Sequence, residues 1–294
     1  MNMKLSIITI NFNNLAGLKK TADSVISQTW KEFEWIIIDG GSTDGSKEFI
    51  VSLNDDLNRN GWNPITYWCS EPDKGIYNAM NKGIAKASGE FLNFMNSGDC
   101  YCQTDTLENI HIYFEREDAD IICGRTIDSM TGEEIFPPLP EEQLLMKILI
   151  LSPLSHQSAF IRKKLQVAHL YDESLSIIAD WKFFMQCITF ENVRPLYISG
   201  FIAKYDTNGI SAQRVKERNE ERYNILCDFY GKGVAELVMQ YNTIRWNDFL
   251  IKTDFLLEHD VSLYVFVRRC LSLAMKYYHF KTKMKQKFCK CKNA

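Results

Sequence analysis

The chain has 294 residues, of which 46% are hydrophobic and 24% charged, and its formal net charge is −3. This composition is that of a folded globular protein. No stretch approaches the roughly 20 apolar residues needed to span a bilayer, which excludes a membrane-spanning chain. The nine cysteines are scattered and odd in number, so we expect buried free thiols rather than disulfides or a zinc site.

Strand and helix patterns alternate through the first part of the chain. We expect strands at 5–10, 33–38, 65–69, 91–95 and 119–123, and helices at 15–28, 46–56, 76–87 and 104–115. Strands separated in this way by helices form a doubly wound, mostly parallel sheet with right-handed crossovers.

The rhythm changes after Gly124. We expect a strand or hairpin at 125–136, a rigid connector at 137–140, a helix at 141–151, and then a strand, a helix and a strand at 159–162, 181–189 and 195–205. From about residue 212 onward the pattern is helical. We therefore expect an α/β domain at 1–212 and a helical C-terminal extension at 213–294.

Polar and acidic side chains follow the first four expected strands. They are Asn11, Asp39, the pair Glu71 and Asp73, and Asp99. In a parallel sheet these strand ends lie on one edge, where ligands of open α/β sheets bind. After Asp39 the glycine-rich turn 40–45 permits a tight bend, and we expect Asp44 to brace this turn.

These residues carry a resemblance to a known family. Thr9-Ile10-Asn11, the turn 39–45 (DGGSTDG), the segment 71–83 (EPDKGIYNAMNKG), the turn 96–99 (NSGD) and Ala179-Asp180 occur in this order. Over about residues 4–212 the chain resembles a family 2 glycosyltransferase with a GT-A fold, of the kind that builds bacterial surface polysaccharides.

The resemblance implies a nucleoside diphosphate sugar as donor. A carboxylate at Asp39 can accept a charge-assisted hydrogen bond from uracil N3–H, or from guanine N1–H and its amino group. Cytosine and adenine offer no such ring N–H. In the family the position that matches Asp39 reads the base, with Thr9 and Asn11 beside it, and uridine is the commoner base.

Two further segments are expected near the donor. Asp73 and Lys74 precede a helix start, where free N–H groups and the helix dipole favour an anion; Lys74 is otherwise a solvated surface lysine. Asn78 either lines the sugar pocket or packs locally. Ser97 either contacts the nucleotide's ribose or only forms the turn.

The turn 96–99 stands where the family usually places an Asp-x-Asp motif. Ser97 occupies the first carboxylate position, so only Asp99 remains as a metal ligand. A single carboxylate together with phosphate oxygens and waters can hold Mg²⁺ or Mn²⁺. We expect one of these ions as cofactor, bound by Asp99.

The resemblance assigns Asp180 as the general base that takes the proton of the acceptor hydroxyl; capping of the following helix is the simpler alternative. The expected reaction is a single displacement with inversion. His156 precedes an apolar strand and is either a structural hydrogen-bond partner or a contact of the donor sugar or the acceptor.

The segment from Val261 to Ala294 contains nine basic and no acidic residues, so the rest of the chain carries −12. Interleaved apolar residues make this the composition of a helix on an anionic membrane surface. The first residues do not have the pattern of a signal peptide, so we expect none. We expect a cytoplasmic protein, peripheral on the inner face of the membrane, with a glycan or lipid-linked acceptor and no nucleic acid partner.

Two other classes of protein compete with this interpretation. A nicotinamide-dependent oxidoreductase requires Gly-x-Gly-x-x-Gly after the first strand, where this chain reads Asn11-Phe12-Asn13-Asn14-Leu15-Ala16. A non-catalytic nucleotide-sugar-binding scaffold would explain the missing first metal carboxylate. Retention of both Asp99 and Asp180 favours the enzyme over this scaffold.

Overall fold

The structure is a computed structural model that describes residues 3–135, 148, 154–206, 209 and 213–245. The chain divides into two compact units, which are described separately. The first comprises 1–144 and 152–214, and the second comprises 145–151 and 215–294.

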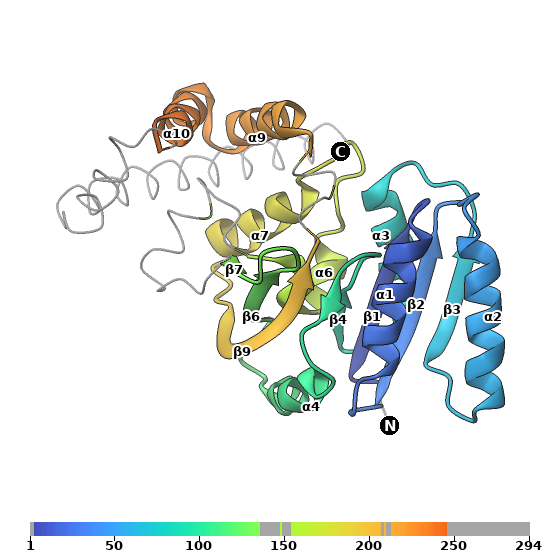
Figure 1. Cartoon of the computed structure of the whole chain (residues 1–294). Coiled ribbons are helices and arrows are strands. Elements are labelled where there is room, and N and C mark those ends of the chain that lie inside the picture. Colours follow the sequence, from blue (N-terminus) through green and yellow to red (C-terminus); the bar gives the residue numbers. More distant parts are fainter. Residues whose placement is uncertain (1–2, 136–147, 149–153, 207–208, 210–212, 246–294) are drawn as a thin grey trace, which may run out of the picture. The chain divides into compact units, whose positions relative to one another are not determined.

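A nine-stranded sheet forms the first unit, in the order β3-β2-β1-β4-β8-β6-β9-β5, with β7 paired to β6 (Figure 1). Its strands are β1 (Leu5–Asn11), β2 (Phe33–Asp39), β3 (Ile65–Ser70), β4 (Phe91–Phe94), β5 (Cys100–Tyr101), β6 (Ile121–Asp128), β7 (Glu134–Ile135), β8 (Ala159–Arg162) and β9 (Leu196–Tyr205). The strands β3, β2, β1 and β4 are parallel to one another. Beyond β4 the sheet is mixed, because β8 is antiparallel to both β4 and β6.

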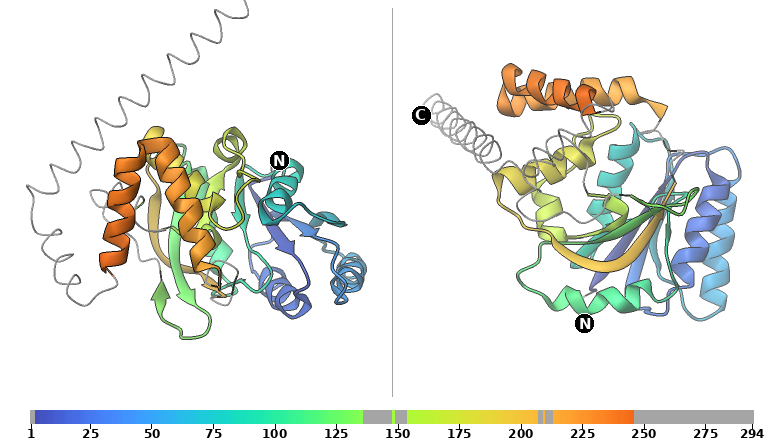
Figure 2. Two further views of the ribbon diagram at one scale, coloured as in Figure 1. Left: turned by 90° about the horizontal axis from the view of Figure 1, so that it is seen from above. Right: turned by 60° about the vertical axis from the view of Figure 1, so that its left-hand side comes forward.

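Helices cover both faces of this sheet (Figure 2). They are α1 (Leu15–Ile26), α2 (Ser46–Arg59), α3 (Ile76–Lys86), α4 (Thr106–Ile110), η1 (His111–Glu115), η2 (His156–Ser158), α6 (Lys163–Ala168) and α7 (Ala179–Phe190). In Figure 2, α1 and α2 lie on one side of the sheet, and α3, α6 and α7 lie on the other. This arrangement is the predicted α/β architecture.

Most predicted elements are present with ends shifted by one to three residues. The helix expected at 104–115 is instead the short α4 followed by the 3₁₀ turn η1, and β6 continues through Gly124 to Asp128 before the expected hairpin. The short strand β5 and helix α6 were not predicted. Of the helix expected at 141–151 only Ile148 is described, and it is helical.

The first two strands form the centre of the core. All seven residues of β1 and all seven of β2 are buried, as expected for parallel strands covered on both faces. Their register places Asn11 opposite Asp39, and the β2–β3 register places Asp39 opposite Ser70. Three polar side chains thus end neighbouring strands in one row.

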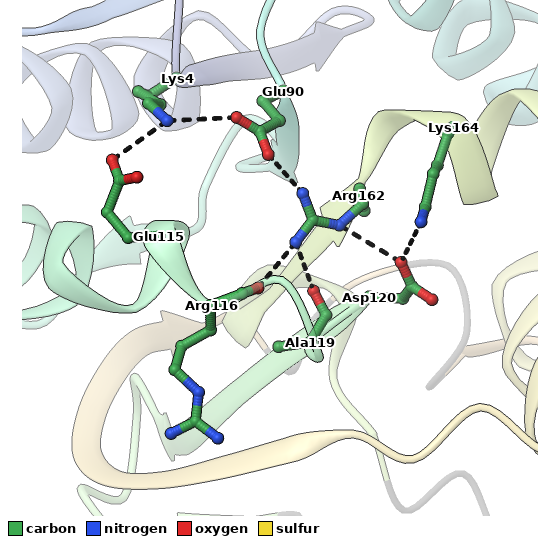
Figure 3. A network of polar contacts seen from close by, with 8 residues as sticks. All are labelled: Lys4, Glu90, Glu115, Arg116, Ala119, Asp120, Arg162 and Lys164. Carbon is green, nitrogen blue, oxygen red and sulfur yellow. Dashed lines mark hydrogen bonds and ion pairs between the residues drawn. The ribbon is translucent and has the colours of Figure 1, made fainter.

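A polar cluster around Arg162 closes the opposite end of the parallel strands (Figure 3). Arg162 pairs in register with Phe91, the first residue of β4, and its guanidinium lies 4.5 Å from the centre of the Phe91 ring. It forms ion pairs with Glu90 and Asp120. It also donates to the backbone carbonyls of Arg116 and Ala119, at 2.8 and 3.0 Å. One buried cation therefore joins β4, β8 and the start of β6.

Replacing Arg162 by methionine should lower the free energy of unfolding by about 3 kcal/mol. Removing one partner of a buried ion pair costs about 3–5 kcal/mol, and here the carboxylates are partly exposed. Urea unfolding measures this difference. Arg116→Ala is the matched control, because the Arg116 side chain points away from the cluster and pairs with Asp118 at the surface. Equal losses of unfolding free energy in the two variants would contradict a stabilising role for the Arg162 cluster.

The described part of the second unit is a helix pair, α9 (Val215–Tyr230) and α10 (Lys232–Arg245), which pack against each other. Gly231, between them, has φ +83°, a conformation that favours glycine. Residues 215–230 and 232–245 of the segment expected to be helical are thus helical, and the domain boundary at 212 stays a prediction. No helix in the described ranges has the length and apolar character needed to cross a bilayer. The basic segment 261–294 lies outside the described residues.

Candidate functional site

Asp39 is the centre of a hydrogen-bonded row at the carboxyl edge of the sheet. Its Oδ1 accepts from Asn11 Nδ2 at 2.7 Å and from Ser42 Oγ at 2.5 Å. Its Oδ2 accepts from Ser42 N at 3.0 Å and from Ser70 Oγ at 2.6 Å. Asp39 is 0% exposed. A carboxylate offers about four lone-pair sites, so all of them are in use.

Burial alone would raise the pKa of the Asp39 carboxyl, but the hydrogen bonds from Ser42, Ser70 and Asn11 outweigh burial and hold the pKa below its usual value. Asp39 is therefore ionised at neutral pH. A contact between this carboxylate and a nucleobase requires that the hydroxyl of Ser42 or Ser70 first gives up its bond. In the structure, Asp39 shapes the turn 39–45.

Thr9 is also turned into the protein. Its hydroxyl donates to the Met95 carbonyl at 2.8 Å and accepts from Trp35 Nε1 at 2.9 Å, and the residue is fully buried. The expected contact of Thr9 with the nucleotide remains a prediction. Its described partners indicate that it fixes β1 against β2 and the end of β4.

Asn11 differs from Thr9 because one of its polar atoms has no partner among the described residues. The two bonds that Nδ2 donates to Asp39 and Ser42 fix the orientation of the amide, since a carboxylate only accepts. Asn11 Oδ1 is then buried, and no hydrogen-bond partner is found for it among the described residues. A buried acceptor left in this way costs about 1–3 kcal/mol, so it is a place where a ligand donor would be favourable.

Phe12, which sequence reasoning missed, lies directly beside this row. It is 67% exposed. A methyl group placed on Gly40 would lie 3.1 Å from its ring and 3.0 Å from Asp73 Oδ2. The missing side chain at Gly40 therefore lets both Phe12 and Asp73 lie close against the backbone of the turn. An aromatic residue immediately after a strand-end asparagine was the signal in the sequence, because exposed rings stack on bases.

The segment 71–83 contributes both backbone and charge. Lys82 forms ion pairs with Asp73 at 2.6 Å and with Glu71 at 2.9 Å. These two carboxylates raise the pKa of Lys82. Lys74 is exposed. Gly75, with φ +124°, precedes α3, and no side chain in the described part of the chain caps that helix start. The first N–H groups of α3 are thus free of side-chain caps, as an anion site requires.

Asp44 braces the turn as expected. Its carboxylate accepts from the backbone and hydroxyl of Ser46 and from the backbone N–H of Leu15. The helix α2 begins at Ser46, with Gly45 at φ +93° before it. One aspartate thereby connects the starts of α1 and α2.

The turn 96–99 holds Asp99 in a buried position. Asp99 Oδ1 accepts from the Asp206 backbone N–H at 2.9 Å, and Oδ2 accepts from Gln157 Nε2 at 3.0 Å. Burial, only partly offset by these bonds, raises the pKa of the Asp99 carboxyl to about 6. Ser97 Oγ is buried and has no hydrogen-bond partner within the described ranges.

These oxygen donors are of the type that Mg²⁺ and Mn²⁺ prefer. Each Asp99 oxygen accepts one hydrogen bond and keeps a second lone pair, and the Ser97 hydroxyl has no other described partner. In the described ranges no three His, Cys, Asp or Glu side chains gather as a metal site. The residues therefore fit an ion that takes its other ligands from phosphate oxygens and water.

Helix α7 carries Asp180, which is connected through His156 to Asn96 at the carboxyl edge of the sheet. It lies in the first turn of this helix after the N-cap Ile178, so it is not the cap residue that the simpler alternative required. Its Oδ1 accepts from the Tyr77 hydroxyl at 3.1 Å, and its Oδ2 lies 3.0 Å from His156 Nδ1. His156 Nε2 in turn lies 3.1 Å from Asn96 Nδ2.

Helix α3 fastens the segment that leads to Asp180. Asn81 donates to the Tyr171 carbonyl and accepts from the Tyr171 N–H. Asn78, expected near the donor sugar, donates to Glu173 Oε2 at 2.8 Å, and Asn81 donates to the other oxygen of that carboxylate. These polar residues of α3 hold the chain before α7, a role that sequence reasoning missed.

The chain belongs to glycosyl transferase family 2, whose family model matches residues 6–174. It is 33% identical over 217 residues to an uncharacterised glycosyltransferase of Mycobacterium tuberculosis, an alignment that covers 71% of this chain and 78% of the relative. It is 29% identical over 206 residues to a PGL/p-HBAD biosynthesis glycosyltransferase of Mycobacterium bovis, covering 69% and 77% of the two chains.

Solved structures support the GT-A fold. Residues 1–349 of S. aureus TarS, in complex with UDP-GlcNAc, give a TM-score of 0.60 at 18% identity, covering 87% of this chain and 78% of that one. The mannosyltransferase PcManGT of Pyrobaculum calidifontis, in complex with GDP-Man and Mn²⁺, gives 0.56 at 11% identity, covering 96% and 87%. The predicted family and fold are thus confirmed.

Proposed function

We propose that this glycosyltransferase moves a sugar, with inversion, from a UDP-sugar to a hydroxyl of a glycan or lipid-linked acceptor in polysaccharide biosynthesis. The observation that carries the donor site is the row of buried acceptors without described partners, Asn11 Oδ1 and Ser97 Oγ, at the carboxyl edge of the sheet. Ligand groups that donate to such atoms remove the cost of leaving them unpaired.

The base is proposed to lie between Phe12 and the row of polar residues. The exposed ring of Phe12 offers a stacking surface, and Asn11 Oδ1 can accept the ring N–H of uracil. Asp39 supports this contact by holding the Asn11 amide in place. The diphosphate then extends toward the uncapped start of α3 and Lys74, with Asp73 beside it.

Asp99 and Ser97 would hold Mn²⁺ or Mg²⁺, which neutralises charge on the departing diphosphate when bound. The acceptor oxygen forms a bond to the anomeric carbon of the sugar while the bond from that carbon to the diphosphate breaks. Asp180 takes the hydroxyl proton. The complexes of TarS with UDP-GlcNAc and of PcManGT with GDP-Man and Mn²⁺ support a donor and a metal of these kinds.

The basic segment 261–294 supports attachment to an anionic membrane surface on the cytoplasmic side, where a lipid-linked acceptor would be presented. Liposome sedimentation of the full chain, with and without anionic lipid, tests this attachment.

Thermal-shift measurements with UDP, GDP, CDP and dTDP, each with and without Mn²⁺, test the donor site. UDP should raise the melting temperature most, and Mn²⁺ should increase this effect. A ligand at about 100 times its Kd stabilises the fold by about 2.7 kcal/mol. Asp99→Asn should lose the Mn²⁺ increment, whereas Asp105→Asn, an exposed carboxylate at the start of α4, should keep it. Stabilisation by CDP alone would contradict the assignment of the base.

A further inference from the structure

We propose that His156 is a positioning residue for Asp180: its ring holds the general base ionised and aimed at the acceptor, and it does not bind the donor sugar. This inference rests on the proposed function, in which Asp180 accepts the proton. The observation behind it is a continuous hydrogen-bonded chain from Tyr77 through Asp180 and His156 to Asn96.

The carboxylate of Asp180 determines which atoms donate and which accept in this series of hydrogen bonds. An ionised carboxylate only accepts hydrogen bonds, so at 3.0 Å from Asp180 Oδ2 the proton must sit on Nδ1 of His156. In the neutral ring Nε2 is then an acceptor, and it faces the amide nitrogen Asn96 Nδ2 at 3.1 Å. With the Asn96 amide in this orientation, in which its Oδ1 has no partner among the described residues, each donor meets an acceptor and the Nδ1-protonated tautomer of His156 is selected.

The second oxygen of Asp180 is held from the other side. Tyr77 donates to Oδ1 at 3.1 Å from a buried position on α3, and burial together with the Asp180 charge raises the pKa of Tyr77 well above its usual value. Tyr77 therefore stays a donor at working pH. Each oxygen of Asp180 keeps a second lone pair, and the side chain is 25% exposed, so it can still receive a proton.

The same contacts keep Asp180 in its basic form. Burial alone would raise the pKa of its carboxyl, but the hydrogen bonds from His156, from the Trp181 N–H and from Tyr77 lower it. In the transfer step the acceptor O–H bond breaks and its proton goes to Asp180. The acceptor oxygen bonds to the anomeric carbon, and the bonding pair of the broken carbon–oxygen bond leaves with the diphosphate.

The series of hydrogen bonds ends at Asn96, in the turn 96–99. Asn96 is the first residue of the turn 96–99 that carries Asp99, and η2, which begins with His156, also provides Gln157 as a donor to Asp99. The neighbouring residues His156 and Gln157 thus contact the general base Asp180 and the proposed metal ligand Asp99, respectively. His156 therefore lies between Asp180 and the turn that carries Asp99.

Two isosteric substitutions separate the contacts of the ring. In His156→Asn the side-chain amide nitrogen stands near the place of Nδ1 and can still donate to Asp180. In His156→Gln it stands near the place of Nε2 and cannot. The assay is release of nucleoside diphosphate with Mn²⁺ and water as acceptor, from whichever of UDP-GlcNAc, UDP-glucose and GDP-mannose the unaltered chain hydrolyses fastest, with donor Kd from calorimetry.

We expect His156→Gln to lower kcat about 10- to 100-fold with the donor Kd unchanged, since small misplacements of a catalytic group cost about this much. His156→Asn should stay within about threefold of the unaltered chain. Equal losses in both variants, no loss in His156→Gln, or a tenfold rise in donor Kd would each overturn the proposal; the last would place His156 against the donor sugar.

A measurement without turnover separates this proposal from the proposed function. Nitrogen-15 spectra of the imidazole rings, with His156 assigned by its Asn variant, should show a neutral ring protonated on Nδ1 whose signal moves in Asp180→Asn. An Nε2-protonated ring would refute the positioning role even in an active enzyme. Absence of release from every donor by the unaltered chain would instead refute the proposed function.

Discussion

Asp180→Asn is expected to lower the rate of sugar transfer about 10²- to 10⁴-fold, the usual contribution of a general base. Asparagine keeps the shape of the side chain, and its carbonyl oxygen can still accept the bond from His156 Nδ1. It cannot take a proton from the acceptor. The loss should therefore fall on kcat, measured as release of nucleoside diphosphate, while donor binding stays unchanged.

Asp172→Asn is the control for this substitution. Asp172 lies in the same segment, where its ion pair with Lys182 and its bonds from Ser174 outweigh burial and lower the pKa of its carboxyl to about 2. Its loss should reduce stability at neutral pH without a comparable loss of rate. A fully active Asp180→Asn variant would mean that another group accepts the proton.

Asp39→Ala is expected to abolish stabilisation by UDP and to lower the free energy of unfolding by about 3 kcal/mol or more. The substitution removes an acceptor of four hydrogen bonds and leaves the buried amide of Asn11 and half-buried donors on Ser42 and Ser70 without this partner, at about 1–3 kcal/mol for a fully buried group. The turn beside Phe12 and the fixed Asn11 amide would be lost together. Melting temperatures with and without UDP and Mn²⁺ measure both effects.

The pH dependence of this effect has a definite sign. Because the folded-state pKa of Asp39 lies below its usual value of 3.8, the carboxylate stabilises the fold above about pH 4, and this contribution is lost as the pH falls through the folded-state pKa. The gap between the unaltered chain and Asp39→Ala should thus narrow in acid. Ser70→Ala removes only one of the four bonds and should retain UDP stabilisation; a full UDP response in Asp39→Ala would contradict the account.

The first half of the fold was predictable because its signals are local. Apolar runs such as 33–38 and the alternation of strands with helices define parallel strands whose ends must share an edge. The mixed second half was not, because the insertion of β8 between β4 and β6 is a pairing across distant segments. The two-residue strand β5 has too few residues to show a pattern.

For the site, the sequence indicated which residues share the edge but not which way they face. Asp39 and Thr9 turn inward because polar neighbours across the register satisfy them, and spacing along the chain does not show this. Asn78 was expected either to line the sugar pocket or to pack locally, and in the structure Asn78 and Asn81 contact the segment before α7. That contact spans about 90 residues, so no local pattern carries it.

Release of nucleoside diphosphate from nucleotide sugars, measured with the unaltered chain and Mn²⁺, decides between an enzyme and a scaffold. We expect release from a UDP-sugar to be faster than from GDP-, CDP- or dTDP-sugars and to be lost in Asp180→Asn. Binding of UDP without release from any nucleotide sugar, with any acceptor offered, would contradict an enzyme and favour the nucleotide-sugar-binding scaffold.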